Sequence, residues 1–245
     1  SLLWLQAVKT ASIDKARGEK KQLTQAKGGK LQALKKTHER YADVFAKLGY
    51  PTDLTKHQFP ARKVMSAKTQ EISGLSSKKF IGVAPFAAHK AKMYPIHLIK
   101  KVLQELSNSG EYTIFLFGGG ATEIAQLDKL SEGFKGVVNM AGKLSFTQEL
   151  ELISNLDIML AMDSGNGHLA ALYDIPVLTL WGVTHPSLGF APFNQPTENQ
   201  LLANRTKYPL VPTSVYGNSY PDGYEKAIET ISPNAIVEKL LSVLK

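Results

Sequence analysis

The chain has 245 residues, a length that fits one large domain or up to two ordinary ones, and 43% of them are hydrophobic, which is enough for a real core. No apolar run approaches the roughly 20 residues that cross a bilayer, and the absence of cysteine excludes disulfides and thiolate metal sites. The net charge of +8 favours anionic partners: nucleic acid, an acidic membrane surface or a phosphorylated substrate.

The first 36 residues combine a short apolar segment with a basic one. Residues 2–8 predict a short buried strand. Basic side chains then gather between positions 15 and 36, where only Glu19 opposes them, at Lys15, Arg17, Lys20, Lys21, Lys27, Lys30, Lys35 and Lys36. We interpret this run as a solvated helical face, with contact to an anionic surface as the alternative. No aromatic residue interrupts it, which argues against a stacking platform for single-stranded nucleic acid.

An amphipathic helix is predicted over Thr37–Leu48, because apolar residues recur there at helical spacing. Gly49 and Pro51 end it. Residues 52–78 form a polar connector, and we place a domain boundary near residue 78.

Strands and helices alternate after this boundary. Strands are predicted at 80–84, 112–117, 136–140, 157–161 and 176–181, and helices at 96–106, 122–130, 146–154, 167–172 and Pro233–Leu244. This alternation predicts an α/β fold with a Rossmann-like, doubly wound parallel sheet. Ligands of such a sheet bind beyond the carboxyl ends of its strands.

The loops after the first two of these strands carry candidate ligand contacts. Lys92 lies in the loop 85–95, where its ammonium can face a phosphate or simply face solvent. The run Gly118-Gly119-Gly120 lets the backbone approach a ligand and begins a helix. A tight turn with no ligand is an equally good interpretation of the same three glycines. Glu123, in the first turn of that helix, either complements the helix dipole or accepts hydrogen bonds from a ribose.

Two further loops complete the set, and the last is the most specific. Leu144 lies between a strand end and a helix start, where a base can pack against it, but alone it is interpreted as structural. Asp163 can cap the next helix or hold its loop, Ser164 offers a hydroxyl and Gly165 an amide. With His168, these residues suggest a cradle for a diphosphate at a helix N-terminus; a capped turn with a buried aspartate is the alternative.

The four loops together resemble one family in order and spacing. Over residues 80–245, and more loosely over 10–51, the chain resembles the C-terminal half of the family 9 glycosyltransferases, the ADP-heptose:lipopolysaccharide heptosyltransferases. The most specific motif is an aspartate, a small hydroxyl residue, a glycine, two residues and a histidine. The second is a lysine followed two residues later by an aromatic-proline pair. The residues that carry the resemblance are Lys92-Met93-Tyr94-Pro95, Phe117-Gly118-Gly119-Gly120, Ala141-Gly142-Lys143-Leu144-Ser145, Met162-Asp163-Ser164-Gly165-Asn166-Gly167-His168 and Leu178-Thr179-Leu180-Trp181-Gly182.

The resemblance implies a GT-B enzyme with two facing Rossmann-like domains that inverts the anomeric centre without a metal or other cofactor. Residues 79–245 would be the domain that binds the nucleotide sugar, an ADP-heptose. Residues 1–78 would be the remaining part of an N-terminal acceptor domain and a linker. The implied acceptor is the lipopolysaccharide core, and the implied location is the cytoplasm, with peripheral contact to the inner membrane. No nucleic acid is expected as a partner.

Individual roles follow from the same resemblance. Lys92 would neutralise the diphosphate, and Ser164 and Gly165 would bind it. Asp163 and His168 would shape their loop near the sugar or phosphates. Glu123 would contact the ribose and Leu144 would contact the base. Both contacts would lie beside the turn at Gly119.

The sequence departs from the family at two places. Ala87 and Ala88 stand where the family often has hydroxyl residues, and no strand, glycine-rich loop and aspartate base precede residue 80. We therefore expect a truncated chain that binds nucleoside diphosphates weakly and transfers sugar poorly or not at all. The alternatives are a GT-B enzyme with another donor, including a nucleotide-sugar epimerase, and a basic module that binds anionic lipid or nucleic acid.

Overall fold

A parallel sheet forms the centre of the molecule. The computed structural model describes residues 8–25, 28, 30–74 and 78–244. In this part of the chain the sheet has six strands in the order β3-β2-β1-β4-β5-β6, and every neighbouring pair is parallel. The strands are β1 (Lys79–Ala84), β2 (Tyr112–Leu116), β3 (Val137–Asn139), β4 (Ile158–Met162), β5 (Val177–Trp181) and β6 (Gln200–Leu202). The predicted doubly wound parallel sheet is confirmed.

The strand order reverses between β1 and β4, which lie side by side with Ala84 opposite Ala161. From β1 the chain winds outward to β2 and β3, and from β4 it winds the other way to β5 and β6. The connections after β1 and β4 therefore diverge and leave a crevice at the carboxyl edge of the sheet.

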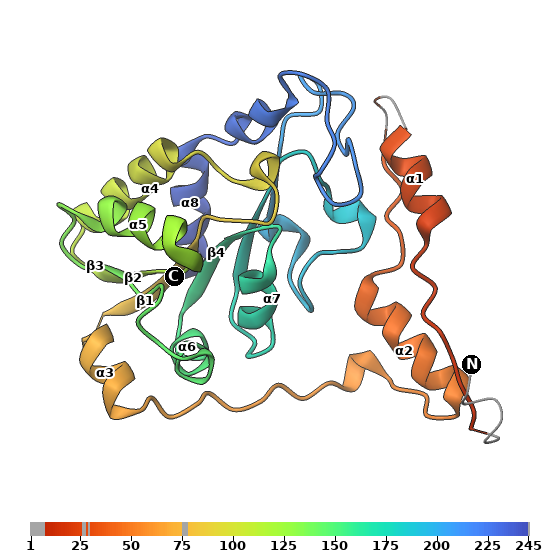
Figure 1. Cartoon of the computed structure of the whole chain (residues 1–245), viewed down its shortest axis with the longest axis horizontal. Coiled ribbons are helices and arrows are strands. Elements are labelled where there is room, and N and C mark those ends of the chain that lie inside the picture. The colour runs from red at the N-terminus through yellow and green to blue at the C-terminus, as the bar shows by residue number, and fades with distance from the viewer. Residues whose placement is uncertain (1–7, 26–27, 29, 75–77, 245) are drawn as a thin grey trace.

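Helices cover both faces of this sheet, and the two N-terminal helices lie beside it (Figure 1). The longer ones are α2 (Thr37–Leu48), α4 (Ile96–Asn108), α5 (Gly120–Ser131) and α8 (Pro233–Leu244), and the shorter ones are α1 (Arg17–Gln25), α3 (Ala67–Ser73), α6 (Phe146–Ile153) and α7 (Gly165–Ala171). Single 3-10 turns lie at Leu54–Lys56, Lys90–Lys92, Pro186–Leu188 and Thr197–Asn199, and a longer one lies at Tyr224–Thr230.

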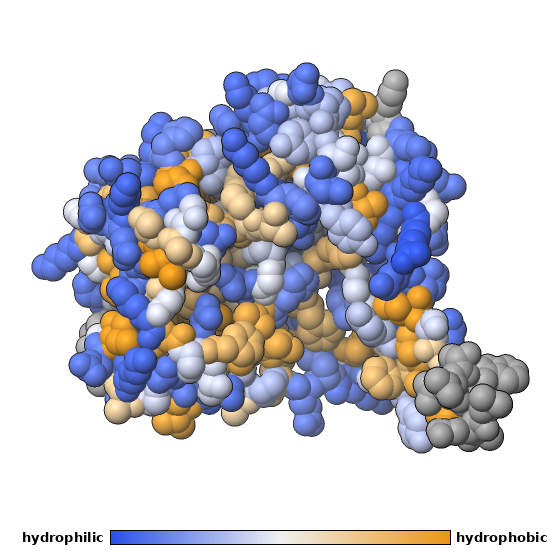
Figure 2. Space-filling model, viewed as in Figure 1, coloured by the Kyte–Doolittle hydropathy of each residue, from blue (hydrophilic) through white to orange (hydrophobic). Residues whose placement is uncertain are grey.

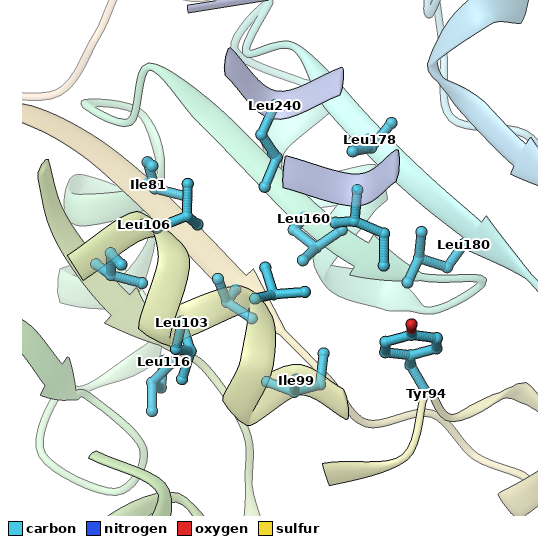
Figure 3. Close-up of a cluster of buried hydrophobic side chains, with 14 of the residues drawn as sticks. Ile81, Tyr94, Ile99, Leu103, Leu106, Leu116, Leu160, Leu178, Leu180 and Leu240 are labelled. Atoms are coloured by element: carbon cyan, nitrogen blue, oxygen red, sulfur yellow. The ribbon is translucent and has the colours of Figure 1, made fainter. Parts of the chain in front are cut away.

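Alternation along the strands divides the core into two layers. Ile81 and Val83 of β1 and Leu160 of β4 point to one face, where helices α4, α5 and α8 cover them (Figure 3). Phe80 and Ala84 of β1 point to the other face and pack with residues of α6 and α7. Both faces are buried, which is why the strands are nearly continuous apolar runs in the sequence.

The predicted helices at Thr37–Leu48 and Pro233–Leu244 have the predicted bounds, and the other predicted elements differ at their ends by at most two residues. The sequence did not predict α3 or β6, and α1 was expected only as a helical face without stated bounds within residues 15–36. Helix α1 has no apolar stripe, and β6 has only three residues, so neither produces a periodic pattern. The strand predicted at 2–8 lies outside the described residues, except Val8, which is not in a strand.

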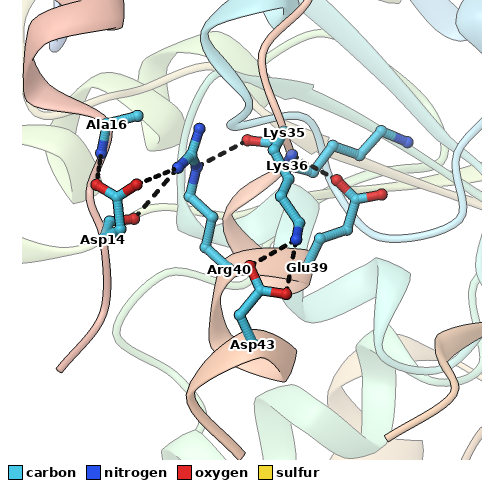
Figure 4. A network of polar contacts seen from close by, with 7 residues as sticks. All are labelled: Asp14, Ala16, Lys35, Lys36, Glu39, Arg40 and Asp43. Carbon is cyan, nitrogen blue, oxygen red and sulfur yellow. Dashed lines mark hydrogen bonds and ion pairs between the residues drawn. The ribbon is translucent and has the colours of Figure 1, made fainter. Parts of the chain in front are cut away.

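The N-terminal segment lies along one side of the sheet and returns through an extended stretch to α3 (Figure 1). Arg40 of α2 is buried and ties this segment together, because its guanidinium donates to the Lys35 carbonyl and pairs with the Asp14 carboxylate at 3.2 Å (Figure 4). The Thr37 backbone and hydroxyl both donate to the Gly189 carbonyl, which joins the start of α2 to the loop after β5.

Candidate functional site

Two adjoining clefts open at the point where the strand order reverses. The first, of about 410 Å³, runs from the loop after β2 to the start of α7 and is lined by Gly119, Glu123 and Glu149 among others. The second, of about 310 Å³, contains Lys92, Asp163 and His168. Both clefts share Ala88, Ser164 and Gly165, so the residues predicted from the first and fourth loops do come together here.

Lys92 and Asp163 form a buried ion pair across the crevice. The Lys92 ammonium lies 2.9 Å from Asp163 Oδ2, and the two side chains are only 12% and 10% exposed. The Thr184 hydroxyl donates to the same carboxylate oxygen at 2.9 Å. The sequence left two roles open for Asp163, capping the next helix or holding its own loop in place. Ser164 occupies the N-cap of α7, so Asp163 has the second role. The Lys92 charge is therefore already balanced before any diphosphate binds.

A loop that the sequence did not single out covers Lys92. Gly217 has a φ of +79°, and a Cβ placed there would lie 2.7 Å from Lys92 Cγ and Cδ. The neighbouring Tyr216 and Val215 line the second cleft. The region after β6 has no periodic pattern, so sequence reasoning had no signal for this loop except its glycines and prolines.

Ser164 and Gly165 present unused binding capacity to both clefts. The Ser164 hydroxyl oxygen is buried and has no hydrogen-bond partner among the described residues. A Cβ built on Gly165 would meet no described atom within 4 Å, so the protein itself does not require a glycine there. A buried hydroxyl without a partner is destabilising, and a ligand oxygen in this space would remove that cost.

His168 lies one turn further along α7, between the second cleft and an apolar cavity of about 490 Å³. Part of its ring is open to the cleft, but crowding by protein atoms removes water from it. This desolvation lowers the pKa of His168; the Asp163 carboxylate opposes the shift and the Lys92 ammonium adds to it. The neutral form of the imidazole is therefore favoured.

Gly119 and Glu123 bond to each other at the start of α5. The Gly119 backbone N–H donates to Glu123 Oε2 at 2.8 Å, so this carboxylate serves its own helix. Leu144 packs against the second layer of the core and does not line either cleft. Glu149, in the first turn of α6, also lines the first cleft, and burial raises the pKa of its carboxyl.

The basic N-terminal run is only partly a solvated face. Lys20 of α1 is buried, with its ammonium 4.1 Å from the centroid of the Phe190 ring, and Phe190 lines both the second cleft and the apolar cavity. Lys15, Arg17 and Lys21 remain exposed. Apolar side chains gather near α2 beside this run (Figure 2). Tyr41 of the same helix is exposed and lines the apolar cavity.

No helix among the described residues is long and apolar enough to cross a membrane. Within the same residues, no group of three or more histidine, aspartate or glutamate side chains is arranged to hold a metal ion.

The sequence matches the family model of glycosyltransferase family 9 (heptosyltransferase) over residues 3–220. The chain belongs to this family. Its curated relatives include lipopolysaccharide heptosyltransferase 3 of Escherichia coli, which is 28% identical over 162 residues that make up 63% of this chain and 46% of the relative. Lipooligosaccharide heptosyltransferase 2 of Haemophilus influenzae is 27% identical over 194 residues, or 76% of this chain and 54% of the relative. The family 9 chain thus spans about half the length of the curated relatives it matches.

Solved structures of family 9 share the fold. A glycosyltransferase of family 9 from Veillonella parvula superposes with a TM-score of 0.66 at 17% identity, covering 88% of this chain and 62% of the other. E. coli heptosyltransferase WaaC with ADP superposes with a TM-score of 0.57 at 21% identity, covering 88% and 58%. These likenesses confirm the predicted α/β fold of the GT-B type, although the described residues contain one sheet only.

Proposed function

We propose that this chain binds the nucleotide-diphosphate sugar of an inverting heptosyl transfer, an ADP-heptose, and that the acceptor is the lipopolysaccharide core. The observation that carries the proposal is the unpartnered Ser164 hydroxyl beside the Lys92–Asp163 pair, at the crevice where the strand order reverses. This is where open α/β sheets bind their ligands. Membership of family 9 and the curated relatives named heptosyltransferases support the reaction class.

The lining of the two clefts indicates which residues contact the diphosphate. The diphosphate takes the shared region, where Ser164 and Gly165 supply a hydroxyl and an amide and Lys92 supplies a cation held in place by Asp163. In the transfer step, an acceptor oxygen attacks the anomeric carbon, the bond to the diphosphate breaks, and these groups stabilise the leaving diphosphate. We assign no residue of the described part of the chain as the base that takes the acceptor proton.

The domain assignment and the setting belong to the same proposal. Residues 79–245 form the donor-binding domain, and residues 1–78 form the acceptor-side segment and linker. The protein works in the cytoplasm, and the exposed basic residues Lys15, Arg17 and Lys21 contact the anionic inner face of the membrane. Transfer requires no resident metal, and unchanged activity in excess EDTA would support this point.

Calorimetric titration with ADP, UDP and AMP tests the donor site. We expect ADP to bind more tightly than AMP, because AMP lacks the second phosphate, and more tightly than UDP. Ser164→Ala should raise the Kd for ADP about tenfold or more, since one hydrogen bond to a charged group is lost. Ser242→Ala, at an exposed position of α8, is the matched control. Absence of binding at millimolar ADP, with Lys92→Ala indistinguishable from the wild type, would refute the proposal.

A further inference from the structure

Glu149 lies on the wall of the first cleft without a partner. It belongs to the first turn of α6, its side chain is partly buried, and it lines the cleft together with Glu123 and Gly119. Among the described residues its carboxylate makes no hydrogen bond or ion pair, and desolvation raises the pKa of the group with no opposing charge. A carboxylate in this condition costs free energy unless a ligand supplies a hydrogen-bond donor.

Stabilising its own helix does not explain this position. Carboxylates are favourable in the first turn of a helix, but the N-terminus of α6 already has a capping box. Ser145 accepts from the Gln148 backbone, and the Gln148 side chain accepts from the Ser145 backbone. A glutamate that served only the helix dipole would do so equally well in solvent, without the desolvation that Glu149 suffers.

The charge distribution along the first cleft shows which part of a nucleotide reaches Glu149. Glu123 and Glu149 line the first cleft but not the second, and their carboxylates repel phosphate. The region shared with the second cleft carries the free Ser164 hydroxyl and the open space beside Gly165. A nucleoside diphosphate therefore lies with its phosphates at Ser164 and its nucleoside beside the two glutamates.

The two glutamates are not equivalent. Glu123 Oε2 already accepts the Gly119 N–H, whereas both Glu149 oxygens are available. We propose that Glu149 is a specificity-determining residue of the donor site, whose carboxylate accepts a hydrogen bond from an O–H or N–H group of the bound nucleoside. This inference rests on the proposed function, because it assumes that the first cleft holds a nucleoside diphosphate.

Selectivity among nucleotides is the readout, since a purely structural role of Glu149 would not change it. The Kd of ADP, 2′-deoxy-ADP, 3′-deoxy-ADP and inosine diphosphate would be measured for the wild type, Glu149→Ala and Glu149→Gln. Glu105→Gln, at an exposed position of α4, is the control. We expect Glu149→Ala to weaken ADP binding about tenfold, as for other hydrogen bonds to charged groups, and Glu149→Gln to restore part of the loss.

The analogues identify the group that Glu149 contacts. If it is a ribose hydroxyl, one of the deoxy nucleotides binds equally to the wild type and to Glu149→Ala. If it is the exocyclic amine of the base, inosine diphosphate, which lacks that amine, shows the equality instead. If the wild type binds ADP and Glu149→Ala has the same Kd as the wild type for all four nucleotides, this inference is overturned. The proposed donor site is not affected by that result. Absence of ADP binding to the wild type overturns both.

Discussion

Replacing Asp163 by asparagine removes the charge that faces the Lys92 ammonium while keeping the size of the side chain. The two charged atoms are 2.9 Å apart and both side chains are nearly buried. The asparagine can still accept from the Thr184 hydroxyl, so the change isolates the ion pair from that hydrogen bond. The Lys92 ammonium is then left in the crevice with its own charge unbalanced.

The expected loss follows from the burial of the pair. Removing one partner of a buried pair costs about 3–5 kcal/mol. Because each side chain keeps about a tenth of its surface in contact with water, we take the lower end, about 3 kcal/mol. For a chain of this length, 1 kcal/mol corresponds to roughly 2–4 °C in Tm, so Asp163→Asn should lower Tm by about 6–12 °C.

Urea unfolding followed by circular dichroism, together with a thermal scan, measures this loss. The double variant Lys92→Met, Asp163→Asn removes both charges and should regain most of the lost free energy of unfolding, because a buried pair replaced as a unit is often neutral. Asp222→Asn, at an exposed position, controls for the chemical change itself. A loss below 1 kcal/mol for Asp163→Asn, or a double variant no more stable than it, would refute the account of the ion pair.

Three further predictions concern the core, the loop over Lys92 and pH. Leu160→Ala, at a fully buried position in β4, should lower the free energy of unfolding by about 3 kcal/mol, whereas Leu202→Ala, at a 42% exposed position, should cost far less in the same urea titration. Gly217→Ala and Gly223→Ala both strain a positive φ, but only the first places a Cβ against Lys92; equal effects of the two on ADP affinity would contradict the packing described. Burial lowers the pKa of His185 from 6.5 to about 4, so the neutral form stabilises the fold above pH 6.5, and this contribution, at most about 3 kcal/mol, is lost as the pH falls toward 4. His185→Gln should flatten the pH dependence of the unfolding midpoint over that range.

The sequence alone determined that the sheet is parallel and doubly wound. Strands that are buried on both faces must be apolar at nearly every position, and this made β1, β4 and β5 visible as short apolar runs between helical patterns. The loops after those strands could also be located, because parallel strands bring their carboxyl ends to one edge. Lys92, Asp163, Ser164, Gly165 and His168 were therefore predicted to meet, and they do.

The tertiary structure decided how those residues are used. Only the fold shows that Lys92 is neutralised by Asp163, because the two residues lie in loops after different strands. Glu149 faces the first cleft because α6 lies on the face of the sheet next to α7, which no local pattern reveals. The sequence determines which residues reach the edge of the sheet, since periodicity is local; their pairing and charge depend on contacts between segments far apart in the chain.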